Sequence, residues 1–115
     1  MSGPILRLAV ASKQGLSIDE HFGHAKQFWV YEVSAQHCEL LEHRQVEHYC
    51  LGNTSSKTAM AGILETIKDC SAVFVAKIGD GPTEKLRKIN IDAITNYAYE
   101  ELSPSLIDYY HEVSL

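Results

Sequence analysis

His21 and His24 are separated by Phe22 and Gly23, just after a β-like stretch of the sequence. Neutral imidazole is a good ligand for iron and zinc, and a glycine between two histidines lets the backbone approach a bulky ligand. A loop that presents both imidazoles could therefore hold a metal ion or a metal cluster. Two such histidines also occur as exposed polar loop residues or helix caps, and no CxxC or HxxxH pair lies nearby.

Cys50 is the preferred thiolate candidate. It lies between an expected strand and an expected helix, in the run Tyr49-Cys50-Leu51-Gly52. Backbone N–H groups and the helix dipole favour anions and thiolates at such a position. A single cysteine can equally be a small buried hydrophobic residue. We assign Cys70, which leads into an apolar run, to the core, and we give Cys38 no role.

A glycine-rich turn, Gly79-Asp80-Gly81-Pro82, follows an almost unbroken apolar run at residues 72–78. In open α/β sheets, ligands tend to bind outside the carboxyl ends of such strands. The glycines could equally serve the tight turn alone. The turn has neither the Lys-Ser/Thr pair of a Walker loop nor the third glycine of a dinucleotide fingerprint, so a nucleotide is not indicated.

Length and charge indicate the number of domains and the kind of partner. The chain has 115 residues, of which 45% are hydrophobic, and a formal net charge of −5 from 15 acidic and 10 basic residues. This length suits one compact domain, which we expect at residues 5–115, with residues 1–4 as a flexible terminus or a cloning remnant. Because the basic residues form no cluster, nucleic acid is not an expected partner.

The cysteines and the hydropathy indicate the compartment. Three well-separated cysteines without a secretory leader argue against a disulfide framework and favour the reducing cytoplasm. No apolar run approaches the roughly 20 residues of a spanning helix, so we expect a soluble protein without a membrane partner.

The chain alternates between apolar runs and helical patterns, which predicts an α/β fold. Expected strands lie at residues 5–11, 27–33, 39–46, 72–78 and 91–95, the second and third as an antiparallel hairpin. The run at 72–78 is the best candidate for a central, parallel strand. Together with three helices the order is β-β-β-α-β-α-β-α, a mixed sheet with helices on its faces.

The helices are predicted from caps and apolar spacing. The first is expected to be capped by Asn53 or Thr54 and to place Ile63 and Ile67 on its buried face. The second should begin with Pro82 at the first helical position and end at Asn90 in a left-handed conformation. The third should begin at Ser103 and Pro104 and turn three side chains inward, those of Leu106, Ile107 and Tyr110.

Aromatic residues lie mainly on an expected strand and near the last helix. Alternation along 27–33 places Trp29 and Tyr31 on one face, which indicates the core more than a stacking surface. The later tyrosines are expected to pack at helix edges, namely Tyr97, Tyr99, Tyr109 and Tyr110.

Taken together, several motifs resemble those of the nitrogenase iron-molybdenum cofactor maturation family. The likeness is to the NifX-like domain, which occurs alone in NifX and fused at the carboxyl end of NifB, and it extends from Leu6 to Tyr110. The motifs that carry it are His21-Phe22-Gly23-His24-Ala25 with Phe28 and Tyr31-Glu32-Val33, Tyr49-Cys50-Leu51-Gly52, Asp69-Cys70-Ser71-Ala72-Val73 and Lys77-Ile78-Gly79.

The resemblance implies a ribonuclease H-like five-stranded mixed sheet and the binding of an iron-sulfur precursor of the iron-molybdenum cofactor as cargo. It implies His21 as the leading cluster ligand, with His24 and Cys50 as weaker, NifB-like additions. The implied cofactor-binding set is His21, Phe22, Gly23, His24, Cys50, Gly52 and Gly79. The implied partners are nitrogenase cofactor-assembly proteins, namely a scaffold and a cluster-synthesising enzyme.

A carrier fits these residues better than a catalyst does. One or two imidazole or thiolate ligands would hold an anionic cluster reversibly, whereas four cysteines would hold it too tightly to pass on. The CxxxCxxC motif of the radical-SAM half of NifB is absent. We therefore expect either a free-standing NifX-like protein or an excised NifB tail.

Two other functions remain as hypotheses. A ribonuclease H-like nuclease needs several carboxylates around divalent metal ions, including one on the first strand, and residues 5–11 contain no Asp or Glu. We therefore do not expect an enzyme. The other hypothesis is an interaction or regulatory domain that binds a partner enzyme through the edge of the hairpin without binding metal.

Overall fold

The computed structural model describes residues 5–22, 25, 27–34, 37–45 and 56–114. Its elements are β1 (Leu6–Val10), β2 (Gln27–Val33), β3 (Cys38–Gln45), α1 (Ser56–Ile67), β4 (Ala72–Phe74), α2 (Asp80–Lys88), β5 (Asp92–Ile94) and α3 (Leu102–Ser114). No helix in this described part of the chain is long and apolar enough to cross a membrane.

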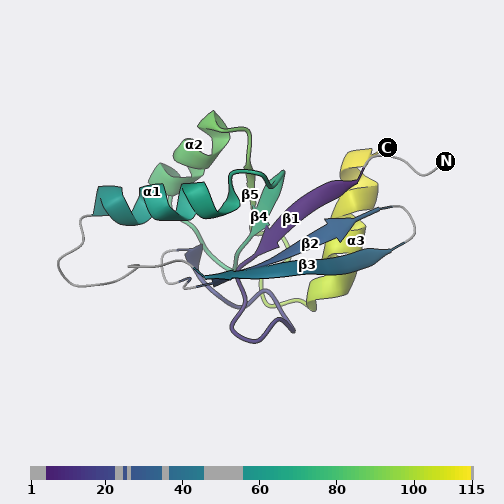
Figure 1. Cartoon of the computed structure of the whole chain (residues 1–115). Helices are drawn as coiled ribbons and strands as arrows, with labels where there is room; N and C mark the ends of the chain where they lie inside the picture. The colour runs from purple at the N-terminus through teal and green to yellow at the C-terminus, as the bar shows by residue number, and fades with distance from the viewer. Residues whose placement is uncertain (1–4, 23–24, 26, 35–36, 46–55, 115) are drawn as a thin grey trace.

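The strands form one five-stranded sheet in the order β3-β2-β1-β4-β5 (Figure 1). β2 is antiparallel to both β1 and β3, whereas β4 is parallel to both β1 and β5. The predicted mixed sheet, in which the second and third strands form an antiparallel hairpin, is therefore confirmed. The central strand is β1 and not β4, because the hairpin adds two strands on one side of β1 and the parallel pair adds two on the other.

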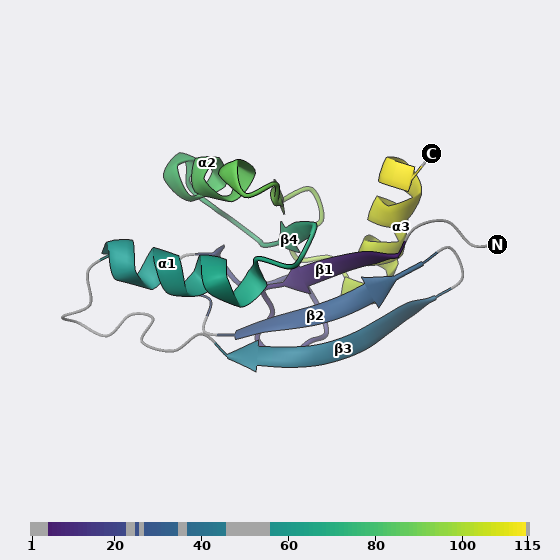
Figure 2. The same cartoon turned by 45° about the horizontal axis from the view of Figure 1, so that its top comes forward.

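Alternate side chains of the sheet enter two separate hydrophobic cores, as the two-residue period of a strand requires. Ala9 faces a core that includes Ile63 and Ile67 of α1 and Leu86 of α2. Leu8 and Val10, on either side of Ala9 in the strand, face the other core. α3 contributes Leu102, Leu106, Tyr109 and Tyr110 to this second core. The helices therefore cover both faces of the sheet, with α1 and α2 on one side (Figure 2).

Helix boundaries differ from the predicted ones in two places. α2 begins at Asp80 with Gly79 as its N-cap, so Pro82 is the third helical residue; a missing N–H still costs nothing there, within the first turn. α3 begins at Leu102, and Ile107 is 37% exposed, so its predicted inward orientation is wrong. Asn90 has a φ of 64°, which confirms the predicted left-handed residue after α2.

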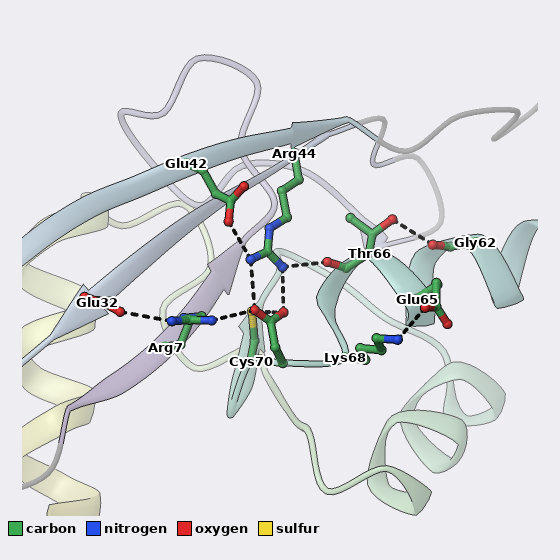
Figure 3. A network of polar contacts seen from close by, with 10 residues as sticks. Arg7, Glu32, Glu42, Arg44, Gly62, Glu65, Thr66, Lys68 and Cys70 are labelled. Carbon is green, nitrogen blue, oxygen red and sulfur yellow. Dashed lines mark hydrogen bonds and ion pairs between the residues drawn. The ribbon is translucent and has the colours of Figure 1, made fainter.

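An ion-pair network ties the hairpin to the connection between α1 and β4. The guanidinium of Arg44 on β3 donates to both carboxylate oxygens of Asp69, at 2.6 and 2.9 Å, and to the carbonyl of Thr66. Arg7 on β1 donates to the same carboxylate at 2.7 Å and to Glu32 on β2 at 3.1 Å (Figure 3). Arg44, Arg7 and backbone hydrogen bonding together hold the pKa of Asp69 well below its usual range.

Candidate functional site

The chain between β1 and β2 runs along the carboxyl ends of β1 and β4. The N–H of Ala76 donates to the carbonyl of Glu20 at 2.9 Å, and the N–H of Phe22 donates to the carbonyl of Lys77 at 2.8 Å. His21 and Lys77 form an isolated parallel bridge between these two segments. Backbone hydrogen bonds therefore fix His21 beside the residues that follow β4, at the edge where ligands bind in such sheets.

Phe22 anchors this segment in the core. Its side chain is only 2% exposed and belongs to the core beneath α1 and α2, with its ring centroid 6.3 Å from that of Phe28. His21 directly precedes this buried phenylalanine, and its own side chain is half-buried. The imidazole of His21 therefore lies at the surface of the sheet edge. Phe22 is thus placed as an anchor of the site, with its ring directed into the core.

The imidazole of His21 contacts a residue far away in the sequence. Its Nε2 lies 3.4 Å from the phenolic oxygen of Tyr99, in the segment between β5 and α3. Tyr99 is 66% exposed and adopts a φ of 65°. The expectation that Tyr99 packs at a helix edge is therefore wrong, whereas Tyr97, Tyr109 and Tyr110 do pack in or against the core beneath α3.

Positive electrostatic groups accompany His21. Lys77 is exposed, and its ammonium has no ion-pair partner among the residues that the structure describes. Two residues later, Gly79 caps α2 without a side-chain hydrogen bond to the first turn. The helix dipole favours an anion at that turn, which also carries the acidic side chain of Asp80. The structure thus places two predicted site residues, His21 and Gly79, at the sheet edge that also carries Lys77.

The other predicted ligands, Gly23, His24, Cys50 and Gly52, lie outside the described residues. Within the described part of the chain, no three His, Cys, Asp or Glu side chains gather as a metal site. A separate surface hollow of about 200 Å³ lies between α2 and β5, away from His21. It is lined by Thr83, Arg87, Ile91, Asp92, Ala93 and Ile94.

Cys70 is a core residue, as predicted. It packs in the core beneath α1 and α2, and its burial, reinforced by the carboxylate of Asp69, raises the pKa of its thiol to about 12. Cys38 is the first residue of β3, where burial also raises its pKa. A cluster ligand must be a thiolate, and burial disfavours the thiolate form of both cysteines.

Trp29 is occupied by contacts within the chain. Its indole N–H donates to the carbonyl of Ser12 at 3.0 Å, and its ring stacks on that of His43 with centroids 4.3 Å apart. Tyr31 is buried on the same face. The assignment of both aromatic residues to the core is therefore confirmed, with Trp29 at its margin.

Two residues of this edge were missing from the predicted site, Lys77 and Tyr99. Lys77 carries a sequence signal, because it directly precedes Ile78-Gly79 after the buried run. Tyr99 carries none that a single sequence reveals, since its contact with His21 spans 78 residues.

Comparisons with known proteins agree with the motifs. Residues 4–111 match the family model described as "Dinitrogenase iron-molybdenum cofactor". The FeMo cofactor biosynthesis protein NifB of Herbaspirillum seropedicae is 40% identical over 109 residues, covering 95% of this chain and 21% of that protein. NifB of Sinorhizobium fredii is 42% identical over 101 residues, covering 88% of this chain and 20% of that protein.

NifB of Azotobacter vinelandii is 36% identical over 113 residues, covering 96% of this chain and 22% of that protein. The chain therefore spans about a fifth of the length of these relatives. The family match extends over nearly the whole chain and includes the segments that carry His21, Lys77 and Gly79. By this match, the chain belongs to the dinitrogenase iron-molybdenum cofactor family, whose members take part in the biosynthesis of that cofactor.

Proposed function

We propose that this domain binds an iron-sulfur precursor of the iron-molybdenum cofactor and carries it during cofactor biosynthesis, without catalysing a reaction. His21 is the leading ligand, and His24 and Cys50 supply further ligands. The cluster is cargo that enters and leaves, not a resident cofactor. The observation that carries the proposal is the backbone-fixed imidazole of His21 beside Lys77, in a chain of this family.

The chemistry of the sheet edge supports reversible binding. A sulfide-bridged iron cluster is anionic, and the exposed ammonium of Lys77 offers it a positive charge. Imidazole is a suitable donor to iron. Because few strong donors are involved, the cluster can be handed to another protein.

The proposed partners are nitrogenase cofactor-assembly proteins, namely a scaffold and a cluster-synthesising enzyme, in the cytoplasm. The names of the relatives support this proposal, since they are FeMo cofactor biosynthesis proteins. We further propose that the fold is ribonuclease H-like, which the mixed strand order β3-β2-β1-β4-β5 and the helices on both faces support.

Anaerobic titration of the apo-protein with isolated precursor cluster, followed by absorption and electron paramagnetic resonance, tests the proposal. We expect His21→Ala to weaken binding by more than about 100-fold, because the loss of a residue that only supports a ligand already costs about 10- to 100-fold. His24→Ala and Cys50→Ala should weaken it less. The thermal midpoint of His21→Ala should stay near that of the wild type, because the side chain of His21 is only partly buried.

His37→Ala is the matched control, because His37 is an exposed histidine beyond the far end of β2. It should bind the cluster like the wild type. Equal affinity of the wild type, His21→Ala, His24→Ala and Cys50→Ala would remove the proposed ligands and with them the carrier function.

A docking function without metal is the second candidate, favoured by the edge strand β3. Leu40 and Leu41 on this strand are 47% and 42% exposed. If docking is the function, Leu40→Glu or changes around Trp29 will abolish cofactor assembly, whereas His21→Ala will leave it intact. The carrier function predicts the reverse result in the same assay.

A further inference from the structure

β3 forms one edge of the sheet, because β2 is its only neighbour in the strand order (Figure 2). Its eight residues make it the longest of the five strands, and it exposes the side chains of Leu40 and Leu41. The strand at the opposite edge, β5, has only three residues. A long edge strand offers its unpaired backbone groups to another strand, so β3 is the edge that a partner can extend.

The hydrogen-bond pattern of the hairpin shows which residues of β3 direct their backbone groups away from β2. The N–H of Ser34 donates to the carbonyl of His37 at 2.8 Å, so these two residues form a hydrogen-bonded pair. In an antiparallel ladder such pairs alternate with pairs whose backbone groups point away from each other. Alternation along β2 continues past the bulge at Leu41. The outward residues of β3 are therefore Cys38, Leu40, His43 and Gln45.

One row of side chains on β3 is acidic. Glu42 lies opposite Val30, which faces the core beneath α1 and α2, and Glu39 lies opposite the β2 residue two positions further on. Both carboxylates are therefore on that face, and their side chains are 71% exposed for Glu39 and 49% exposed for Glu42. Arg44 belongs to the same row, but it is mostly buried and donates to Asp69. The accessible charge of this row is thus negative.

The other row of side chains on β3 is apolar and aromatic. Leu40 lies opposite Tyr31, and the ring of His43 stacks on that of Trp29. Tyr31 and Trp29 belong to the core beneath α3 or pack against it. Because side chains alternate between the two faces of a strand, an added strand would meet the acidic row with one set of side chains and the apolar row with the other.

We propose that the free edge of β3 binds an extended segment of another protein in which basic residues alternate with apolar ones. The backbone of that segment pairs with the four outward residues of β3. Its Lys or Arg side chains face Glu39 and Glu42, and its apolar side chains cover Leu40 and the ring of His43.

The charges of β3 select this occupant. Opposite charges directly across two neighbouring strands stabilise the pairing, and like charges destabilise it. A second copy of this domain would bring the same two exposed carboxylates and is therefore disfavoured. β2 and β1 separate this edge from β4, after which His21 lies beside Lys77. The inference therefore goes beyond the carrier function and does not depend on it.

Two synthetic peptides of eight residues, the length of β3, test the proposal. One alternates Lys with Val, and the other alternates Glu with Val. Amide hydrogen exchange of the nitrogen-15-labelled domain is followed by NMR with each peptide. We expect the Lys peptide to slow the exchange of the N–H groups of Leu40 and His43, which point to the free edge. The N–H groups of Glu39 and Glu42 already face β2 and should not change, and the Glu peptide should not bind.

Charge reversal on the acidic row sharpens the test. Glu39→Lys should weaken the affinity for the Lys peptide by about 10-fold, because it turns an attractive cross-strand pair into a repulsive one. The double variant with Glu42→Lys should bind the Glu peptide instead. Glu84→Lys is the matched control, since it makes the same change of charge on α2, beside β5 at the opposite edge. It should bind the Lys peptide like the wild type, and thermal midpoints check that each variant is folded.

Unchanged exchange at Leu40 and His43 with the Lys peptide, or equal affinity for the two peptides, would overturn the proposal. Sedimentation that shows a dimer with a protected Leu40 N–H would also overturn it, because a second copy would then cover the edge. Titration with precursor cluster keeps the carrier function separate. Glu39→Lys should bind the cluster like the wild type, and a failure of His21→Ala to weaken cluster binding would leave the peptide result unaffected.

Discussion

The two ends of the parallel pair β1 and β4 are built on different principles. Before β4, Asp69 receives hydrogen bonds from Arg44 and Arg7, so the charges at that end are paired with one another. After β4, Lys77 has no ion-pair partner among the described residues, and the side chain of His21 is half-buried. One end pairs its charges with one another, and the other exposes the charge of Lys77 to solvent.

The contrast predicts which substitutions should change the stability of the fold and which should change the binding of the cluster. Charge-assisted hydrogen bonds within a network stabilise the fold, whereas a binding edge has to keep donors and cations accessible. Substitutions at Asp69 should therefore change stability without changing cluster affinity, and a substitution at His21 should do the opposite. The three predictions below test that separation.

Phe22→Ala should have the largest effect on stability. The ring is 2% exposed in the core beneath α1 and α2, and removal of such a ring costs about 3–5 kcal/mol of unfolding free energy. Urea denaturation measures it, and Phe22→Leu, which refills most of the volume, should cost far less. A loss below about 1 kcal/mol would mean that the binding edge is not anchored in the core.

Asp69→Asn should lower the unfolding free energy by about 1–3 kcal/mol at pH 7, because it removes the charge that two arginines contact. The pKa of Asp69 is depressed in the folded protein, so its contribution is fully present above the ordinary aspartate value of about 4. The difference from the wild type should therefore shrink as the pH falls below about 4, in denaturation curves recorded at several pH values.

The control for Asp69 is Glu84→Gln. Glu84 pairs with Arg87 in an exposed i,i+3 pair on α2, and its loss should cost less than about 1 kcal/mol. Both variants should bind the precursor cluster like the wild type. Weaker cluster binding by Asp69→Asn would contradict the separation of the two ends.

Gly15→Ala should have the smallest of the three effects. Gly15 lies in the loop after β1 with a φ of 76°, and a Cβ atom there would lie 3.3 Å from the ring of Trp29. We expect a loss of about 1–2 kcal/mol in thermal or urea denaturation. Gly81→Ala is the matched substitution, since a Cβ atom there meets nothing within 4 Å, and it should be neutral or stabilising.

Patterns that depend on neighbouring residues were predictable. The aromatic and β-branched run at 27–33 coincides with β2, and Asn90 adopts the left-handed conformation expected after α2. Ile107 was misplaced because two adjacent helical positions can both be apolar, and only the angle at which α3 meets the sheet decides which one is buried.

The sequence by itself determined the mixed α/β class, the apolar runs that become strands and the motif that contains His21, because these depend on local periodicity and residue type. Only the tertiary structure decided that Lys77 and Tyr99 meet His21, and that Arg7 and Arg44 share one carboxylate. The physical reason is that these contacts join residues 25 to 78 positions apart in the sequence. Such contacts depend on the order of the strands and on which loops the sheet brings together.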